Sequence, residues 1–330
     1  MVRAPDNSKG FGGDDWNNAI GAPQAIGEIA ILLAEDLAED ELSYATRKSL
    51  RRFPISNEHT GANTASMAVI NTLLGILSKD SSLLAAASRL MWNEIKVTTG
   101  EGIQPDYSFH QHASLLQFGQ YGITYTQDLC NLLEAYQGTP WQVPAERMEI
   151  LRRYLIEGLQ WPSYKGTFDI SSNGRFWYNV RYKVINCLAI MRLMEKLDPE
   201  KQDLYQSFVE RNTTPYSSEL NGNRFFCRSG YLINRRGDFF SSVKISSRRI
   251  IGAESFGGDN RSGYHLADGV ALFYRTGKEY DDIFPLWDWR KLPGTTCTQE
   301  KLKPFKTTAV DTDCAGGVSA GDEGIVAFLF

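Results

Sequence analysis

The chain has 330 residues, enough for one large or two ordinary domains, and 42% of them are hydrophobic and 22% charged. These fractions are typical of a folded globular protein and argue against an intrinsically disordered one. The 35 basic and 39 acidic residues give a net charge of −4, which argues against a nucleic acid as a partner.

Helical periodicity dominates residues 1–211, which we expect to form a first, helical domain. Apolar residues recur there at three- and four-residue steps, the spacing of the buried stripe on an amphipathic helix. The stretches with this spacing are residues 26–37, 67–77, 84–91, 151–159 and 184–194. Segments rich in Gly, Pro and Asn join them, so we expect helical hairpins packed side by side. No stretch reaches the length of a membrane span, and we expect no membrane partner.

Short β-branched or aromatic runs between turn residues characterise residues 212–330, which we expect to form a second domain of antiparallel strands. The clearest runs are residues 230–234, 238–245, 270–274 and 325–330, and residues 235–238 fit a hairpin turn. Helices followed by strands, without alternation, predict an α+β fold rather than a parallel α/β sheet. The last apolar run ends the chain without a polar tail, so we expect the chain to be a portion of something longer.

The densest polar cluster surrounds His110 and His112. A metal site here has little support, because the other histidines are distant in sequence and no HExxH pattern occurs. Without a ligand role, one histidine would be a core residue and the other a surface residue. Tyr121 follows His112 by nine residues, or about 900° around one continuous helix, so the two side chains converge only if the chain bends. Gly119 and Gly122 permit such a bend.

Three further polar clusters are ordinary turn or loop signals when taken alone. Asn63 follows a Gly-Ala pair in a loop before an apolar-periodic stretch, where it fits a turn or helix cap. The sequence Asn-Gly-Arg at 173–175 and the run at 257–261 fit hairpin turns or exposed loops. No nucleophile elbow, phosphate loop or dinucleotide fingerprint is present. The five cysteines form no CxxC pair, so we expect core or free thiols.

Taken in chain order, these clusters resemble polysaccharide lyase family 8, the hyaluronate, chondroitin AC and xanthan lyases. The matching stretches are residues 15–28, 60–63, 102–122, 173–175, 254–269 and 284–296, the last reading FPLWDWRKLPGTT. Each motif is moderately specific, but the ordered set is highly specific because it covers nearly the whole chain. The resemblance implies an α/α toroid of helical hairpins followed by an antiparallel β-sandwich region. Against the longer family members, the toroid would lack its first helices and the β region its later sheets.

The resemblance also implies the catalytic residues of a cleft on the toroid. His112 and Tyr121 match the family's catalytic histidine and tyrosine, and Arg175 matches an arginine beside that tyrosine. Asn63 matches the asparagine that helps to neutralise the carboxylate of a uronic acid. The family cleaves acidic polysaccharides by β-elimination, which requires no cofactor.

At the remaining site positions the sequence departs from the family pattern or offers two candidates. Glu254 and Asp259 compete for the position of the family's glutamate, and Asp259 is one methylene shorter. Asn179 stands where the family often has a second arginine, although Arg181 lies close by. The residues assigned to substrate binding are Trp16, Asn17, Asn179, Asn260 and Arg261.

The chemistry makes these assignments sensible. Hydrogen bonds from Asn63 and His112 would let the uronate carboxylate accept charge as the C5 proton leaves. Tyr121 would take that proton if Arg175 draws the pKa of Tyr121 down toward neutrality. The same tyrosine would then protonate the bridging oxygen at C4, leaving a 4,5-unsaturated uronate.

Several functions therefore stay open. The favoured one is a lyase acting on chondroitin or hyaluronan; xanthan is the rival substrate within the same chemistry. A catalytically weak carbohydrate-binding remnant is the alternative from another class. A glycoside hydrolase would need paired carboxylates, and the cleft motifs supply His, Tyr and Asn instead. We expect a monomer that is secreted or periplasmic, because a long polymer does not enter the cytoplasm.

Overall fold

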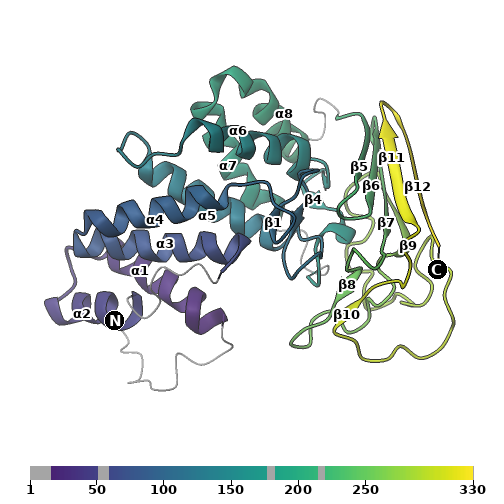
Figure 1. Cartoon of the computed structure of the whole chain (residues 1–330), viewed down its shortest axis with the longest axis horizontal. Helices are drawn as coiled ribbons and strands as arrows, with labels where there is room; N and C mark the ends of the chain where they lie inside the picture. Colours follow the sequence, from purple (N-terminus) through teal and green to yellow (C-terminus); the bar gives the residue numbers. More distant parts are fainter. Residues whose placement is uncertain (1–15, 51–58, 177–182, 215–219, 330) are drawn as a thin grey trace. The chain divides into compact units, whose positions relative to one another are not determined.

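The computed structural model describes residues 16–50, 59–176, 183–214 and 220–329. Within these ranges the chain forms two compact units. The first lies within residues 1–96 and 128–148, and the second within residues 97–127 and 149–330. Helices precede the long strands along the chain (Figure 1), which confirms the expected α+β class.

The first unit is helical. It contains α1 (Ala22–Leu32), α2 (Glu39–Tyr44), α3 (Gly61–Ser78) and α4 (Ser81–Glu94), with π-helical turns η1 (Asn17–Gly21) and η2 (Ala45–Leu50). Helices α3 and α4 lie side by side as a hairpin (Figure 1). Lys79 ends α3 in the left-handed conformation, and the Asp80 carboxylate caps α4 by accepting the Leu83 N–H at 3.1 Å. Within the described ranges, no helix combines the length and apolarity needed to cross a bilayer.

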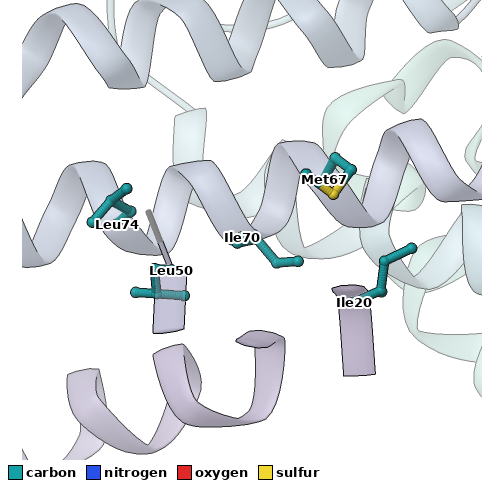
Figure 2. Packing of buried hydrophobic residues seen from close by; sticks show 5 residues of the cluster. All are labelled: Ile20, Leu50, Met67, Ile70 and Leu74. Carbon is teal, nitrogen blue, oxygen red and sulfur yellow. The ribbon is translucent and has the colours of Figure 1, made fainter. Parts of the chain in front are cut away.

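A small apolar cluster holds α3 against the π-helical turns of the same unit (Figure 2). It consists of Ile20, Leu50, Met67, Ile70 and Leu74. The three residues from α3 repeat at steps of three and four, so they form one buried stripe, as the periodicity of residues 67–77 predicts. Each fully buried aliphatic side chain contributes about 1.5–3 kcal/mol.

The second unit begins with short strands and then continues with helices. Strands β1 (Gly102–Ile103) and β2 (Phe109–His110) pair, as do β3 (Ser163–Tyr164) and β4 (Thr167–Phe168). Its helical elements are the end of α6 (Ala145–Arg153), η3 (Tyr154–Leu159), α7 (Lys183–Leu197) and α8 (Gln202–Thr213). Helix α5 (Tyr121–Tyr136) starts in this unit. Arg152 joins α6 to the end of α7 through a bidentate pair with Asp198, at 2.6 and 3.0 Å.

A four-stranded antiparallel sheet follows. Its strand order is β5 (Gly222–Phe226), β6 (Tyr231–Arg236), β7 (Phe239–Ile245) and β9 (Asp268–Tyr274). Two further pairs are β8 (Ala253–Glu254) with β10 (Thr307–Thr308), and β11 (Ala315–Ala320) with β12 (Glu323–Phe328). The predicted turn at 235–238 is a two-residue hairpin in which Arg236 faces Phe239 and Gly237 has a φ of 60°. The sequence analysis did not predict strand β5.

Candidate active site

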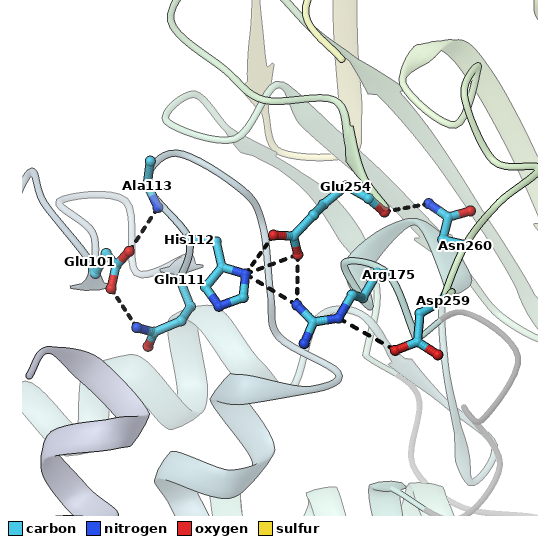
Figure 3. Close-up of polar contacts among 8 residues, drawn as sticks. All are labelled: Glu101, Gln111, His112, Ala113, Arg175, Glu254, Asp259 and Asn260. Atoms are coloured by element: carbon cyan, nitrogen blue, oxygen red, sulfur yellow. Dashed lines mark hydrogen bonds and ion pairs between the residues drawn. The ribbon is translucent and has the colours of Figure 1, made fainter. Parts of the chain in front are cut away.

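The centre of the site is a carboxylate shared by a histidine and an arginine in the second unit (Figure 3). The Glu254 carboxylate oxygens lie 2.7 and 2.9 Å from Nδ1 of His112, and Oε2 lies 2.8 Å from Nη1 of Arg175. Because a carboxylate only accepts, the short contacts place a proton on Nδ1 of His112. The 3.2 Å approach of Arg175 Nη1 to that nitrogen is then a close contact between two donors. Glu254 therefore orients the imidazole and neutralises Arg175.

Tyr121 completes the cluster. Its ring centroid lies 4.9 Å from that of His112, and Cζ of Arg175 lies 5.9 Å from the Tyr121 ring centroid. Burial raises the pKa of Tyr121, and the charge and hydrogen bond of Arg175 lower it only in part. The net pKa of Tyr121 is therefore above its ordinary value. The expectation that Arg175 brings this pKa down toward neutrality is wrong for this structure, because burial outweighs the guanidinium.

The bend that joins His112 to Tyr121 is a loop rather than a kinked helix. His112 and Ala113 both adopt left-handed backbone, with φ of 59° and 62°. The chain then docks on the segment before Arg175, where the Gly119 N–H donates to the Ser172 carbonyl at 3.0 Å. A Cβ at Gly119 would lie 1.2 Å from Oδ1 of Asn173. Glycine at 119 is therefore required for this close approach, and α5 begins two residues later, at Tyr121.

Arg175 is positioned by a buried network on the sheet. The Asp169 carboxylate accepts the hydroxyls of Tyr231 and Tyr274, at 2.5 and 2.8 Å. Lys244 on β7 donates to the Ser171 carbonyl at 3.1 Å. These contacts anchor the turn η4 (Ile170–Ser172), which leads into Arg175. Residues 173–175 are buried, so the exposed-turn interpretation of this motif is wrong.

Glu254 and Asp259, the two candidates for the position of the family's glutamate, differ in their contacts. Glu254 contacts both His112 and Arg175, whereas the Asp259 carboxylate lies 3.7 Å from Nε of Arg175. Burial raises the pKa of Glu254, but hydrogen bonds from His112 and Arg175 outweigh it and hold that pKa below its usual value. Asn260 is 3% exposed and donates to the Glu254 carbonyl at 2.8 Å. Asn260 therefore braces the loop, and its assignment to substrate binding stays a prediction.

The other predicted residues belong to other segments of the chain. Trp16, which is 47% exposed, and Asn17 lie at η1 in the first unit. Asn63 was expected in a loop before a helix, but it lies in the first turn of α3, which begins at Gly61. Arg261 is exposed in the loop that follows Asp259. Asn179 lies outside the described residues, as does Arg181.

Two residues of the site were missed in the sequence. Phe256 is 63% exposed, and Cζ of Arg175 lies 5.4 Å from its ring centroid. An aromatic residue directly before a Gly-Gly pair in a polar loop is the signal that would have found it. Glu101 bonds to residues on either side of His112, and no local motif marks it.

The second histidine of the motif has a structural role. His110 is 1% exposed, and its Nε2 lies 2.9 Å from Oγ of Ser229. Burial, with the charges of Arg228 and Lys244, lowers the pKa of His110 to about 3, so its ring is neutral.

The five cysteines are free thiols, as expected. Among the described residues, no group of three or more His, Cys, Asp or Glu is placed to hold a metal ion.

Two family models match most of the chain. Residues 2–177 match the model of the N-terminal α-helical domain of polysaccharide lyase family 8, and residues 221–330 match its super-sandwich domain. The chain is 27% identical over 329 residues to chondroitinase-AC of Pedobacter heparinus, covering 95% of this chain and 46% of that protein. It is 24% identical to a hyaluronate lyase of Thermasporomyces composti, and the match covers 94% of this chain and 46% of that protein.

Solved structures agree with the sequence matches. A chondroitinase AC lyase superimposes with a TM-score of 0.86 at 25% identity, covering 94% of this chain and 47% of that one. The chondroitin AC lyase of Streptomyces coelicolor superimposes with a TM-score of 0.84 at 21% identity, covering 98% of this chain and 52% of that one. The chain thus spans about half the length of the curated relatives named here. The expected order of a helical domain and an antiparallel β region is confirmed, and the chain belongs to polysaccharide lyase family 8.

Proposed function

We propose that this chain cleaves a uronate-containing polysaccharide by β-elimination, with chondroitin or hyaluronan as the substrate. The observation that carries the proposal is the contact of Tyr121 with the His112–Glu254–Arg175 network. A histidine that a carboxylate holds in place supplies a fixed polar contact for a substrate. A tyrosine beside a cation supplies a proton acceptor next to it. Family membership and the lyase names of the relatives support the same reaction class.

In this proposal the substrate carboxylate is recognised first. Nδ1–H of His112 is committed to Glu254, which leaves Nε2 for the uronate. When Nε2 carries a proton, it donates to that carboxylate and stabilises the charge that develops as the C5 proton leaves. The resemblance gives Asn63 a second hydrogen bond to the same carboxylate. A secreted or periplasmic location follows from a polymeric substrate and forms part of the proposal.

Tyr121 then carries the proton. Its phenolate removes the C5 proton, the C–H electron pair forms the C4–C5 double bond, and the C4–O bond breaks. The neutral tyrosine returns the proton to the leaving oxygen, so the phenolate is regenerated. Because burial raises the pKa of Tyr121, the phenolate is the minor form at neutral pH and Arg175 is the group that favours it. Turnover should therefore rise with pH through the pKa of Tyr121.

A hydrolase has less support although two carboxylates lie near Arg175. A glycoside hydrolase needs one carboxylic acid that stays protonated, and such a group has a raised pKa. The pKa of Glu254 is lowered. Xanthan stays a possible substrate, because a xanthan lyase of Bacillus is 23% identical over 321 residues, covering 85% of this chain and 34% of that protein.

The test incubates the 330-residue chain with chondroitin, hyaluronan and xanthan, and follows ultraviolet absorbance and new reducing ends together. We expect both signals to grow with one of the first two polymers. Growth with xanthan alone would reassign the substrate. New reducing ends without absorbance would contradict elimination and support a hydrolase, and binding without either signal would support a binding remnant.

A further inference from the structure

The backbone around His112 adopts an unusual conformation. Two consecutive residues other than glycine, His112 and Ala113, have φ of 59° and 62°. Left-handed backbone is unfavourable for such residues, and a pair of them persists only where the surroundings hold it. This conformation occurs where the chain leaves the β1–β2 pair at His110 and brings the imidazole of His112 onto Glu254.

The Glu101 carboxylate accepts hydrogen bonds from the residues on both sides of His112 (Figure 3). Its Oε1 accepts the backbone N–H of Ala113 at 2.8 Å, and its Oε2 accepts the side-chain amide of Gln111 at 2.5 Å. Gln111 is 1% exposed, so the second contact reaches into the protein interior. Glu101 itself directly precedes β1, whose register sets Gly102 opposite His110. The hairpin therefore fixes the distance between this carboxylate and the residues that flank His112.

We propose that Glu101 is a positioning residue for His112: by binding Gln111 and the Ala113 N–H, it holds the left-handed turn that presents the imidazole to Glu254. The role of His112 in turnover rests on the proposed function, but the positioning itself does not. Glu101 acts through the side chain of Gln111 and the backbone of Ala113, and each of its carboxylate oxygens accepts one of these two hydrogen bonds. Loss of Glu101 should therefore lower kcat more than it changes KM.

The conformation offers a direct test by rescue. Glycine adopts left-handed backbone without the penalty that alanine has, so an Ala113→Gly chain should depend less on Glu101. Glu101→Ala removes both contacts, while Glu101→Gln keeps one acceptor oxygen and the shape of the side chain. Glu279 is a matched control, because its carboxylate also accepts backbone N–H groups, those of Arg275 and Thr276, in a loop that no contact joins to His112 within the described residues.

The experiment measures kcat, KM and the ring ¹⁵N signals of His112, which are assigned by comparison with His112→Gln. We expect Glu101→Ala to lower kcat by about tenfold, the loss expected from one or more hydrogen bonds to a charged group, with little change in KM. The His112 signals should shift in Glu101→Ala. Glu101→Gln should lose less kcat, and Glu279→Ala should have the kcat and the His112 signals of the wild type. In the Ala113→Gly background the loss should be smaller.

Two results would overturn the proposal. One is unchanged His112 signals in both Glu101 variants. The other is an equal kcat loss whether Glu101 is replaced in the wild-type chain or in the Ala113→Gly chain, which would assign the effect to charge rather than to the turn. If the wild type has no lyase activity, the proposed function fails, and the His112 signals still decide whether Glu101 positions the ring.

Discussion

Replacing Glu254 by glutamine keeps the shape of the side chain and removes the charge that His112 and Arg175 share. Glu254 accepts from two donors, Nδ1–H of His112 at 2.7 Å and Nη1–H of Arg175 at 2.8 Å. A glutamine has one acceptor oxygen and places an NH₂ group against the second donor. At least one charge-assisted hydrogen bond is lost, which is worth about 1.5–3 kcal/mol. If that loss falls on the transition state, kcat/KM drops about 10- to 150-fold.

The assay is the pH profile of the ultraviolet signal for Glu254→Gln. The charge of Glu254 raises the pKa of Tyr121, so its removal should also move the rising limb of the profile to lower pH. Asp259→Asn is the matched control, because Asp259 lies 3.7 Å from Arg175 and its side chain is 31% exposed. Because Asp259 is partly exposed and lies beyond hydrogen-bond distance, we expect the loss of this pair to cost about 1 kcal/mol or less, or about fivefold. Glu254→Gln activity within about twofold of the wild type would refute the reasoning.

Two further substitutions test the electrostatics and the packing of the site. Arg175→Gln removes the cation that lowers the pKa of Tyr121, so the rising limb of the pH–rate profile should move to higher pH; a shift to lower pH would contradict the role given to Arg175. Gly119→Ala places a Cβ 1.2 Å from Oδ1 of Asn173 and should lower the free energy of unfolding by at least about 2 kcal/mol in urea titrations. Gly316→Ala meets no atom within 4 Å and should change it by less than about 0.5 kcal/mol, and equal losses in both variants would contradict the packing argument.

The helical part of the fold could be predicted because apolar residues recur at three- and four-residue steps along each helix. The stripe that includes Met67, Ile70 and Leu74 recurs along α3 and faces one buried cluster. Strands of two residues, such as β1 and β2, carry no periodicity, so their pairing could not be predicted. That pairing sets Glu101 beside the turn at His112.

The sequence analysis named His112, Tyr121, Arg175 and Glu254, which lie together in the structure, but it did not predict their geometry. The sequence shows that His112 and Tyr121 need a bend, and Gly119 takes part in it. The decisive left-handed residues, His112 and Ala113, are not glycines, so nothing local marks them. The pKa of Tyr121 was predicted in the wrong direction, because the degree of burial depends on tertiary packing and is invisible in a motif.

The mass of the cleavage products tests elimination by Tyr121 most directly. Elimination consumes no water, so each cut made by the wild type should leave an unsaturated fragment that is lighter by one water than the corresponding hydrolysis product. Tyr121→Phe keeps the ring beside His112 and removes the hydroxyl that carries the proton, so it should form no such fragment above background. Saturated products from the wild type, or unsaturated products formed by Tyr121→Phe at the wild-type rate, would contradict the account.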